Sequence, residues 1–574
     1  MAEAGGQALL LGKRKLLIRQ EQEFLSPLLF SRIALLLVSG MIAGGRCSSS
    51  SSSSSFSAVL APNMSSCQLP QHFPSGQEPY DCCAPPADYE PRLFRPVGGG
   101  SPLRVRRPAH AADDAYAAKL ARAYTLMKAL PPDDPRSFSQ QANIHCAYCN
   151  NVYRQMNSTQ PFQVHNTWLF FPFHRWYIYF HERILARLLG DDLDFALPFW
   201  NYDHPDGASI PWLFSISSSA AYPVLSAGAL RDSTHEFPAT VALDFGVDTD
   251  LRPRSVQLQE NDNTMYRAIV RDARDRPAFF GWPYRRGDSP MEGFGFGTVE
   301  WQPHNTIHSW VGNKSAIGWK HMGALFASGL DPVFYSHHAE IDRFWELWKA
   351  LPDHEDFDEE EYKNAEFLFY NEDGELVRVR AGDASNTTLL GYVYEEVETP
   401  WMGAVPEKRS FAPATLGADD TVCLVGESIE SSPCSFIVER DPEVSKASPS
   451  LHDHLVLTML YNDTMMRLDV YLNFPSANAT TNSGCKEFVT QISYTHFTFV
   501  GDDAQLVGNN TVRLDITERL VDLNLTQEGS IVVTLVPRLP NLSIFPSGGN
   551  TVLLSAFVEY AIPYQRWDAM SAYL

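Results

Sequence analysis

The sequence lacks the features that mark nucleic-acid-binding and membrane-spanning proteins. Its 45 Lys and Arg residues are outnumbered by 68 Asp and Glu residues, which gives a formal net charge of −23. This acidity disfavours nucleic acid and anionic membrane surfaces as partners, and no basic stripe is present. The apolar run at residues 33–45 is too short to cross a bilayer. We therefore expect no nucleic-acid partner and no stable membrane insertion of the mature protein.

Metal-binding patterns built on cysteine or carboxylate are also scarce. The nine cysteines contain no recurring CxxC pair of the kind that forms zinc-binding modules. Carboxylates at ligand spacing are nearly absent, which argues against a magnesium or calcium site. Any metal chemistry therefore depends on the histidines.

Residues 1–60 have the character of a targeting presequence. A basic cluster at 13–15 precedes the apolar run at 33–45, whose length is typical of a signal-peptide core, and a serine tract follows. Cysteines in the segment 67–83 are typical of an oxidising compartment. We expect entry into the secretory pathway, with residence in the vacuole or outside the cell. Because the segment before the apolar run is long, delivery to the plastid thylakoid lumen is the alternative.

Apolar residues at helical spacing dominate residues 61–400, which we interpret as one catalytic domain. The spacing predicts helices over 114–130, 139–152, 173–189, 300–312 and 331–349. Residues 190–290 are rich in Pro, Gly, Asp and Ser, and we expect long loops there. A hairpin at 367–379, turning at Asn-Glu-Asp-Gly, extends this domain.

The last third of the chain has a different pattern. Residues 401–430 resemble a linker, with Pro406 and Pro413, and residues 431–574 contain short alternating segments separated by turn residues. The segments at 467–473, 531–536 and 552–558 are typical of strands. We predict a C-terminal β-domain of the sandwich type.

Six histidines have spacings that suit metal binding. His165 and His174 lie at the start of an aromatic helix pattern, and His145 precedes them. His304 and His308 are four residues apart and share one face of the predicted helix. His338 completes the second set, and Asp342, four residues on, is expected to orient a helix or to bind Arg343 or a neighbouring imidazole. Neutral imidazole suits copper, zinc, iron and nickel. Three histidines within 145–174 and three within 304–338 predict two like metal sites that face each other.

Two of these segments carry a specific family pattern. Residues 165–175 (His-x4-Phe-Phe-Pro-Phe-His-Arg) resemble the first copper signature of the tyrosinase family, and residues 331–342 (Asp-Pro-x-Phe-Tyr-x-x-His-x3-Asp) resemble the second. The segment 141–150 is similar to the plant branch, the polyphenol oxidases or catechol oxidases. The resemblance covers roughly residues 67–400 and continues weakly through 467–471 to the C-terminal end.

The resemblance implies a four-helix bundle around a dinuclear copper site. Three histidines would bind each of the two copper ions: His145, His165 and His174 one, and His304, His308 and His338 the other. The family gives His337 no metal role. Cys149 would be joined to His165 by a thioether, and disulfides would pair Cys67 with Cys83 and Cys82 with Cys146. Cys423, Cys434 and Cys485 have no assigned partner, and their odd number leaves at least one unpaired within the chain.

The family pattern also suggests residues beside the copper ions. Glu300 occupies the position of a water-holding glutamate, and Asn305 is the residue type associated with orienting that water. Leu325 stands where the family usually has an aromatic gate over the second copper, which should widen the entrance. The Tyr-x-Tyr mark near the end of the catalytic unit is present at 392–394.

The implied activity is oxidation of o-diphenols to o-quinones with reduction of dioxygen to water, with some monophenol o-hydroxylation compatible with Glu300 and Asn305. Dioxygen and small phenols are the expected partners. The β-domain would cover the active site and keep the enzyme latent until a protease cuts the linker.

Three alternatives are a specialised biosynthetic phenol hydroxylase, a dioxygen carrier of the haemocyanin type, and a zinc hydrolase. The last is disfavoured because no carboxylate accompanies the histidines.

Overall fold

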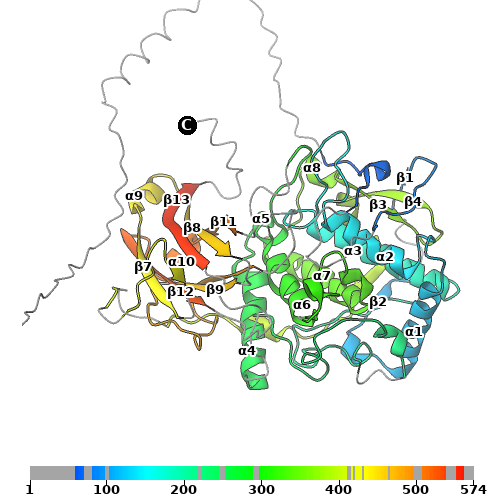
Figure 1. Cartoon of the computed structure of the whole chain (residues 1–574), viewed down its shortest axis with the longest axis horizontal. Helices are drawn as coiled ribbons and strands as arrows, with labels where there is room; N and C mark the ends of the chain where they lie inside the picture. The colour runs from blue at the N-terminus through cyan, green and yellow to red at the C-terminus, as the bar shows by residue number, and fades with distance from the viewer. Residues whose placement is uncertain are drawn as a thin grey trace, which may run out of the picture. The chain divides into compact units, whose positions relative to one another are not determined.

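Four of the predicted helices form where the apolar periodicity places them. In the computed structural model, α1 spans Asp114–Lys128, α2 spans Phe138–Cys149, α3 spans Phe170–Leu188 and α7 spans Val333–Lys349. The side chains of Asp113 and Ser137 cap α1 and α2 by accepting hydrogen bonds from backbone N–H groups. α3 and α7 contact each other, and Figure 1 shows these helices in cyan and green.

The described residues all belong to one unit, Phe56–Leu574. They are 58–69, 81–96, 102–216, 221–244, 252–288, 296–313, 315–409, 415–417, 420–429, 432–462, 466–494, 507–537 and 551–561. The expected presequence therefore lies almost entirely outside the described residues. Among the described residues, no helix is long and apolar enough to cross a membrane.

The prediction that residues 190–290 form loops is wrong for its second half. α4 spans Arg254–Tyr266, the π-helix η5 spans Arg267–Arg271, and α5 spans Arg276–Phe280. The buried side of α4 is mostly polar, with Gln257, Glu260 and Asn261 among its buried residues. Apolar periodicity therefore could not reveal this helix, because hydrogen bonds rather than apolar contacts satisfy its buried face.

The predicted helix at 300–312 is broken. The π-helix η6 spans Glu300–His304 and α6 spans Asn305–Val311. Gln302 lies within η6 but has an extended backbone, φ −146° and ψ 129°, because a residue that precedes proline is pushed out of the helical region. His304 therefore lies just before α6 rather than within one continuous helix with Glu300.

Short elements complete the helical region. The 3-10 helices are η1 Met64–Ser66, η2 Ala109–Ala111, η3 Pro223–Leu225, η7 Ile317–Trp319, η8 Ser328–Leu330, η9 Gly382–Ala384 and η10 Pro400–Gly403, and α8 is Glu360–Lys363. The hairpin prediction is confirmed, since β3 (Glu366–Tyr370) pairs antiparallel with β4 (Leu376–Arg380). β1 (Arg92–Leu93) joins β4 in parallel, and β2 (Arg104–Arg106) pairs in parallel with β5 (Tyr392–Tyr394).

The C-terminal part is a β region built from two four-stranded sheets. Its strands are β6 Ser428–Ile429, β7 Cys434–Glu439, β8 His452–Asn462, β9 Met466–Leu472, β10 Phe488–Tyr494, β11 Val507–Asp515, β12 Ser530–Pro537 and β13 Thr551–Ala561. The strand orders are β10-β9-β12-β7 and β11-β8-β13-β6, and the short helices α9 (Pro442–Ala447) and α10 (Thr517–Asp522) lie between strands. Apolar residues of both sheets, among them Leu457 and Val533, share one core. Figure 1 draws these strands in yellow to red.

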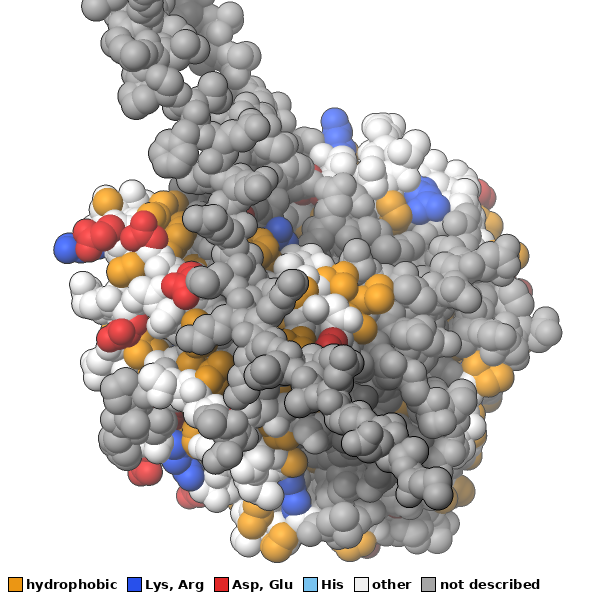
Figure 2. Space-filling model, turned by 60° about the vertical axis from the view of Figure 1, so that its left-hand side comes forward, with side chains coloured by type: hydrophobic (Ala, Val, Ile, Leu, Met, Phe, Trp, Pro, Cys, Tyr) orange, Lys and Arg blue, Asp and Glu red, His pale blue; other side chains and the backbone are white. Residues whose placement is uncertain are grey.

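The helical region and the β region contact each other through polar groups. Trp301 Nε1 donates to the carbonyl of Gln491 at 2.9 Å, and Gln302 Nε2 donates to the Gln491 side chain at 2.8 Å. Glu260 accepts two hydrogen bonds from Ser483. The β region therefore touches the segment that links Glu300 to His304. In Figure 2, the coloured Lys and Arg side chains occur in separate spots among apolar, acidic and uncharged ones.

Candidate metal centre

The structure brings the six predicted histidines together in two buried groups. His145, His165 and His174 gather with Cys149, and His304, His308 and His338 gather with His337. Within each group the ligand atoms lie within 4.8 Å of one another. The groups face each other, since the His174 and His338 rings stack with their centroids 4.2 Å apart. The helices α2, α3, α6 and α7, the π-helix η6 and the loop before α3 thus deliver side chains to one place.

Backbone and side-chain oxygens fix the orientation of four of these rings. The Nδ1 atoms of His145, His174 and His308 lie 2.7–2.8 Å from the carbonyl oxygens of Leu325, Phe170 and Met322, respectively. The Nδ1 atom of His304 lies 3.0 Å from Asn305 Oδ1. An oxygen can only accept, so each Nδ1 carries the hydrogen and each Nε2 keeps a free lone pair.

The ring nitrogens that remain have no protein partner. Among the described residues, the Nε2 atoms of all six histidines are buried and lack a hydrogen-bond partner. Buried polar atoms are rarely left unsatisfied in folded proteins, so a whole set of them in one place needs a ligand. Convergent neutral imidazole nitrogens are the donor set that copper accepts.

Burial keeps the imidazoles neutral. Desolvation lowers the pKa of His145 to about 3 and the pKa of His308 to about 4, and each Nδ1 contact opposes that shift. Desolvation and the neighbouring histidines hold the pKa values of the other four far below the ordinary value near 6.5. At neutral pH all six rings are therefore in the form that binds a metal.

Glu300 and Cys149 lie beside the first group. Glu300 is fully buried and its Oε1 accepts a hydrogen bond from the backbone N–H of Asn166 at 2.9 Å. Burial raises the pKa of Glu300 well above its ordinary value, although its backbone hydrogen bonds oppose the shift. Cys149 is a buried free thiol in the same group as His165, so the two residues of the expected thioether are neighbours.

Leu325 and His337 do not occupy simple ligand positions. Leu325, expected over the second copper, contributes its carbonyl to His145 of the first group, and its side chain is half-buried. His337, for which the resemblance implies no metal role, lies in the second group with its ring centroid 5.3 Å from that of His304. Neither ring nitrogen of His337 has a hydrogen-bond partner among the described residues. In the sequence, the only indication of this position is that His337 directly precedes the predicted ligand His338.

Asp342 has different partners from those expected. Arg343 pairs with Asp203 and Glu340, and among the described residues Asp342 has no hydrogen bond or ion pair with Arg343 or with an imidazole. Instead its Oδ1 forms an ion pair with Arg175, the residue after His174. The pair therefore links α3 to α7.

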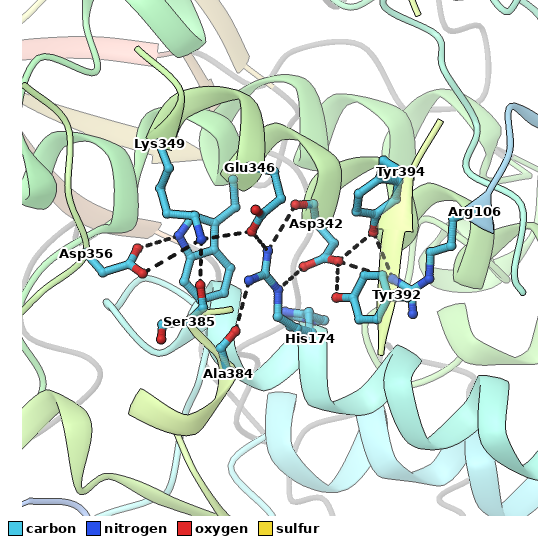
Figure 3. Close-up of polar contacts among 12 residues, drawn as sticks. Arg106, His174, Asp342, Glu346, Lys349, Asp356, Ala384, Ser385, Tyr392 and Tyr394 are labelled. Atoms are coloured by element: carbon cyan, nitrogen blue, oxygen red, sulfur yellow. Dashed lines mark hydrogen bonds and ion pairs between the residues drawn. The ribbon is translucent and has the colours of Figure 1, made fainter. Parts of the chain in front are cut away.

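The Tyr-x-Tyr motif at 392–394 binds the second carboxylate oxygen of Asp342. The hydroxyls of Tyr392 and Tyr394 donate to Asp342 Oδ2 at 2.6 and 2.5 Å, and Arg106 Nη1 lies 3.2 Å from the same oxygen (Figure 3). Burial opposes ionisation, but Arg175 and Arg106 outweigh it and hold the pKa of Asp342 below its ordinary value. A charged, hydrogen-bonded network therefore fixes the two helices that carry His174 and His338.

Disulfides fasten the N-terminal loop to the first metal helix. The implied pairs Cys67–Cys83 and Cys82–Cys146 are both confirmed. The structure also pairs Cys423 with Cys434. Cys485 is the unpaired cysteine of that last set and is buried. The sequence left this choice open because connectivity depends on which strands become neighbours.

Three family models match the chain in succession. The common central domain of tyrosinase matches residues 135–351, the polyphenol oxidase middle domain matches 356–407, and the chloroplastic polyphenol oxidase C-terminal domain matches 435–549. The chain is 35% identical over 512 residues to a chloroplastic polyphenol oxidase of Malus domestica, a match that covers 85% of this chain and 83% of the relative. The chain belongs to the plant polyphenol oxidase branch of the tyrosinase family.

Other polyphenol oxidase relatives have more specialised names. An aureusidin synthase of Antirrhinum majus is 37% identical over 530 residues, covering 89% of this chain and 92% of the relative. A chloroplastic (+)-larreatricin hydroxylase of Larrea tridentata is 37% identical over 501 residues, covering 84% and 83%. These relatives belong to the same family, but their names indicate different substrates.

Solved polyphenol oxidase structures share the fold. Latent apple tyrosinase aligns with a TM-score of 0.68 and 34% identity, covering 82% of this chain and 100% of that one. Latent aurone synthase aligns with a TM-score of 0.74 and 32% identity, covering 88% and 100%. The tyrosinase-type fold, a helical core followed by a C-terminal β region, is thus shared, and the two histidine groups fit a dinuclear copper centre.

Proposed function

We propose that this polyphenol oxidase oxidises o-diphenols to o-quinones with dioxygen as the electron acceptor. The observation that carries the proposal is the pair of facing histidine groups whose Nε2 atoms lack protein partners. His145, His165 and His174 would hold one copper ion, and His304, His308 and His338 the other. When bound, the copper pair would supply the two-electron chemistry with dioxygen. Two catechols and one dioxygen then give two quinones and two waters.

The protein residues orient these ligands and exclude water. The carbonyls of Leu325, Phe170 and Met322 hold the rings of His145, His174 and His308 with Nε2 directed away from them. The Arg175–Asp342 pair fixes α3 against α7. A thioether between Cys149 and His165 would fix a ring whose own Nδ1 has no partner among the described residues.

Glu300 and Asn305 would handle the phenol proton. The Glu300 Oε2 atom is buried without a hydrogen-bond partner among the described residues, so it can hold a water or accept a proton. Monophenol hydroxylation requires the phenolate, and a carboxyl group whose pKa is raised by burial is suited to receive that proton. Leu325, in place of an aromatic gate, would admit wider phenols.

A specialised biosynthetic hydroxylase is the second candidate. The names of the aureusidin synthase and larreatricin hydroxylase relatives support it, as does the small aliphatic side chain of Leu325. Comparing turnover of 4-methylcatechol with that of a larger polycyclic phenol separates the two. A dioxygen carrier would bind dioxygen without turning over either one.

The β region would keep the enzyme latent, and both solved relatives described above are latent forms. We place the catalytic domain at 61–400, the linker at 401–430 and the shielding β-domain at 431–574. Residues 407–409 already contact the β region, since Lys486 N donates to the Glu407 carbonyl at 2.9 Å. Cleavage by a protease within 410–430 would release the shield.

The relatives' names favour the plastid over the secretory pathway. The polyphenol oxidase of Malus domestica and the larreatricin hydroxylase are both named chloroplastic. We therefore propose that residues 1–60 direct the chain to the plastid, which was the alternative destination, rather than to the vacuole or outside the cell. Fusing this segment to a fluorescent protein and imaging plant cells tests the choice.

The first experiment is copper content followed by dioxygen uptake with 4-methylcatechol, before and after removal of the β region. Two copper ions per chain and quinone formation support the proposal. Two copper ions without turnover, even after trimming, indicate a carrier. No copper after reconstitution contradicts it. The matched control is His354→Ala, which removes a histidine outside both groups.

A further inference from the structure

A cavity of about 380 Å³ lies where the helical region meets the β region. From the helical region it is lined by Arg267 and Arg271 of η5 and by Gln302, and from the β region by Val489 of β10 and Arg519 of α10. None of the six histidines of the metal centre lines it. The cavity is therefore a separate site.

Three guanidinium groups in its wall are buried. Arg267, Arg271 and Arg519 are 5%, 6% and 4% exposed. A buried cation is costly unless a negative charge lies beside it. If the protein's own carboxylates do not pair with all three arginines, an anionic ligand could supply the missing negative charge.

Asp272 is shared between two of the arginines. Arg271 Nε and Nη2 lie 2.7 and 3.0 Å from its two oxygens, while Arg519 Nη2 lies 3.9 Å from its Oδ1. Arg519 also pairs with Asp522 at 2.7 Å. Arg271 Nη1 is buried with no hydrogen-bond partner among the described residues.

In the part of the chain that the structure describes, the guanidinium group of Arg267 contacts neutral groups rather than a carboxylate. Its Nη1 donates to the Ser483 carbonyl at 3.2 Å, its Nη2 donates to Thr264 Oγ1 at 3.3 Å, and its guanidinium lies over the Phe488 ring at 4.4 Å. The more distant carboxylates of Glu260, Asp272 and Asp469 only partly offset its charge, because desolvation and Arg271 lower the pKa of Arg267 below its ordinary value.

The other acidic residues that line the cavity have partners of their own. Glu518 pairs with Arg274, Asp515 lies 2.6 Å from His452 Nδ1, and Asp275 caps α5 by accepting from Ala278 N. Desolvation, followed by repulsion from Arg271, lowers the pKa of Arg519 to about 10. Among the described residues, Arg267 therefore has no carboxylate at ion-pair distance, and Arg271 Nη1 has no hydrogen-bond partner.

We propose that this cavity binds a multivalent oxyanion of the phosphate or sulfate class between Arg267, Arg271 and Arg519. The anion would accept charge-assisted hydrogen bonds from both regions and so fasten η5 to α10. The site goes beyond the oxidase proposal and uses none of its residues, so either can fail without the other.

Calorimetric titration of the copper-loaded full chain with inorganic phosphate, at ionic strength held constant with chloride, tests the site. We expect saturable binding of one phosphate, with the dissociation constant raised about tenfold or more in Arg271→Gln, since a hydrogen bond to a charged group is worth about 1.5–3 kcal/mol. Hydrogen exchange of η5 and α10 should slow when phosphate binds.

Two further variants keep the test decisive. Arg122→Gln, an exposed arginine on α1, is the matched control and should bind phosphate as the wild type does. If Arg271→Gln does not fold, Arg271→Lys retains the charge with fewer donors and should still weaken binding. No saturable phosphate binding in the folded wild type, or equal weakening by Arg122→Gln, overturns the proposal.

Discussion

The helical region and the β region each bury an aspartate among arginines, but they use it differently. In the helical region, Asp342 accepts from Arg175, Arg106 and two tyrosine hydroxyls, which come from three separate segments of the chain. In the β region, Asp453 accepts from Arg440, which also donates to three backbone carbonyls. The first network positions metal-binding helices, whereas the second joins segments of the β region to one another.

The two regions differ in how much they depend on polar contacts between residues that are distant in the chain. The strands of the β region are connected by backbone pairing and by two apolar clusters. The histidine groups depend on ion pairs between residues more than 100 positions apart, such as Arg175 and Asp342. Substitutions in the two regions should therefore have separable effects.

The largest expected effect is on activity. His308→Ala removes a proposed ligand, and we expect copper loss at the second group with a fall in catechol oxidation of more than about 100-fold. Removing an outer partner of a ligating imidazole already costs about 10–100-fold. Atomic absorption and dioxygen uptake measure both quantities. The unfolding of the β region should not change, and normal copper content in the variant would refute the ligand assignment.

Asp342→Asn should cause the largest loss of stability. It removes the buried carboxylate that Arg106 and Arg175 share and leaves them only Glu182 and Glu346, respectively, as acidic partners. Breaking a buried ion pair typically costs about 3–5 kcal/mol. Denaturant unfolding measures the free energy, and Asp353→Asn, an exposed aspartate beyond α7, is the control. The lowered pKa of Asp342 means that its stabilisation is present above the ordinary pKa near 4 and is lost as pH falls through the lower folded value. The variant should lack this acid dependence.

Asp453→Asn makes the matching change in the β region. Arg440 keeps its hydrogen bonds to the carbonyls of Leu525, Thr526 and Glu528, so we expect a smaller loss of about 1–3 kcal/mol. Copper content should remain at the wild-type value. A loss of copper equal to that of His308→Ala would show that the two regions are not separable.

The smallest effect should come from His452. Its hydrogen bond to Asp515 raises the pKa of His452, although partial burial opposes the shift, and Asp275 and Glu518 also face it. A raised pKa stabilises the fold fully below the ordinary value near 6.5, and the contribution disappears as pH rises through the folded value. His452→Gln should therefore cost less than about 1 kcal/mol at pH 5 and nothing at pH 9. Thermal unfolding at both pH values, with His354→Gln as control, measures the difference.

The sequence by itself determined the histidine pairs, the long amphipathic helices and the strand-rich C-terminal part. Local periodicity decides these features, so α3 and α7 appear within a few residues of their predicted bounds. It also determined the implied pairs Cys67–Cys83 and Cys82–Cys146, because the family pattern carries them.

Only the tertiary structure decided the rest. The polar face of α4 finds its hydrogen-bond partners in other segments, the break at Gln302 separates Glu300 from α6, and Asp342 selects Arg175 and Arg106 over the adjacent Arg343. The arginine-lined cavity is likewise formed by η5 and α10, which are far apart in the chain. Each of these depends on which distant groups become neighbours once the apolar faces are buried, and no local pattern records that outcome.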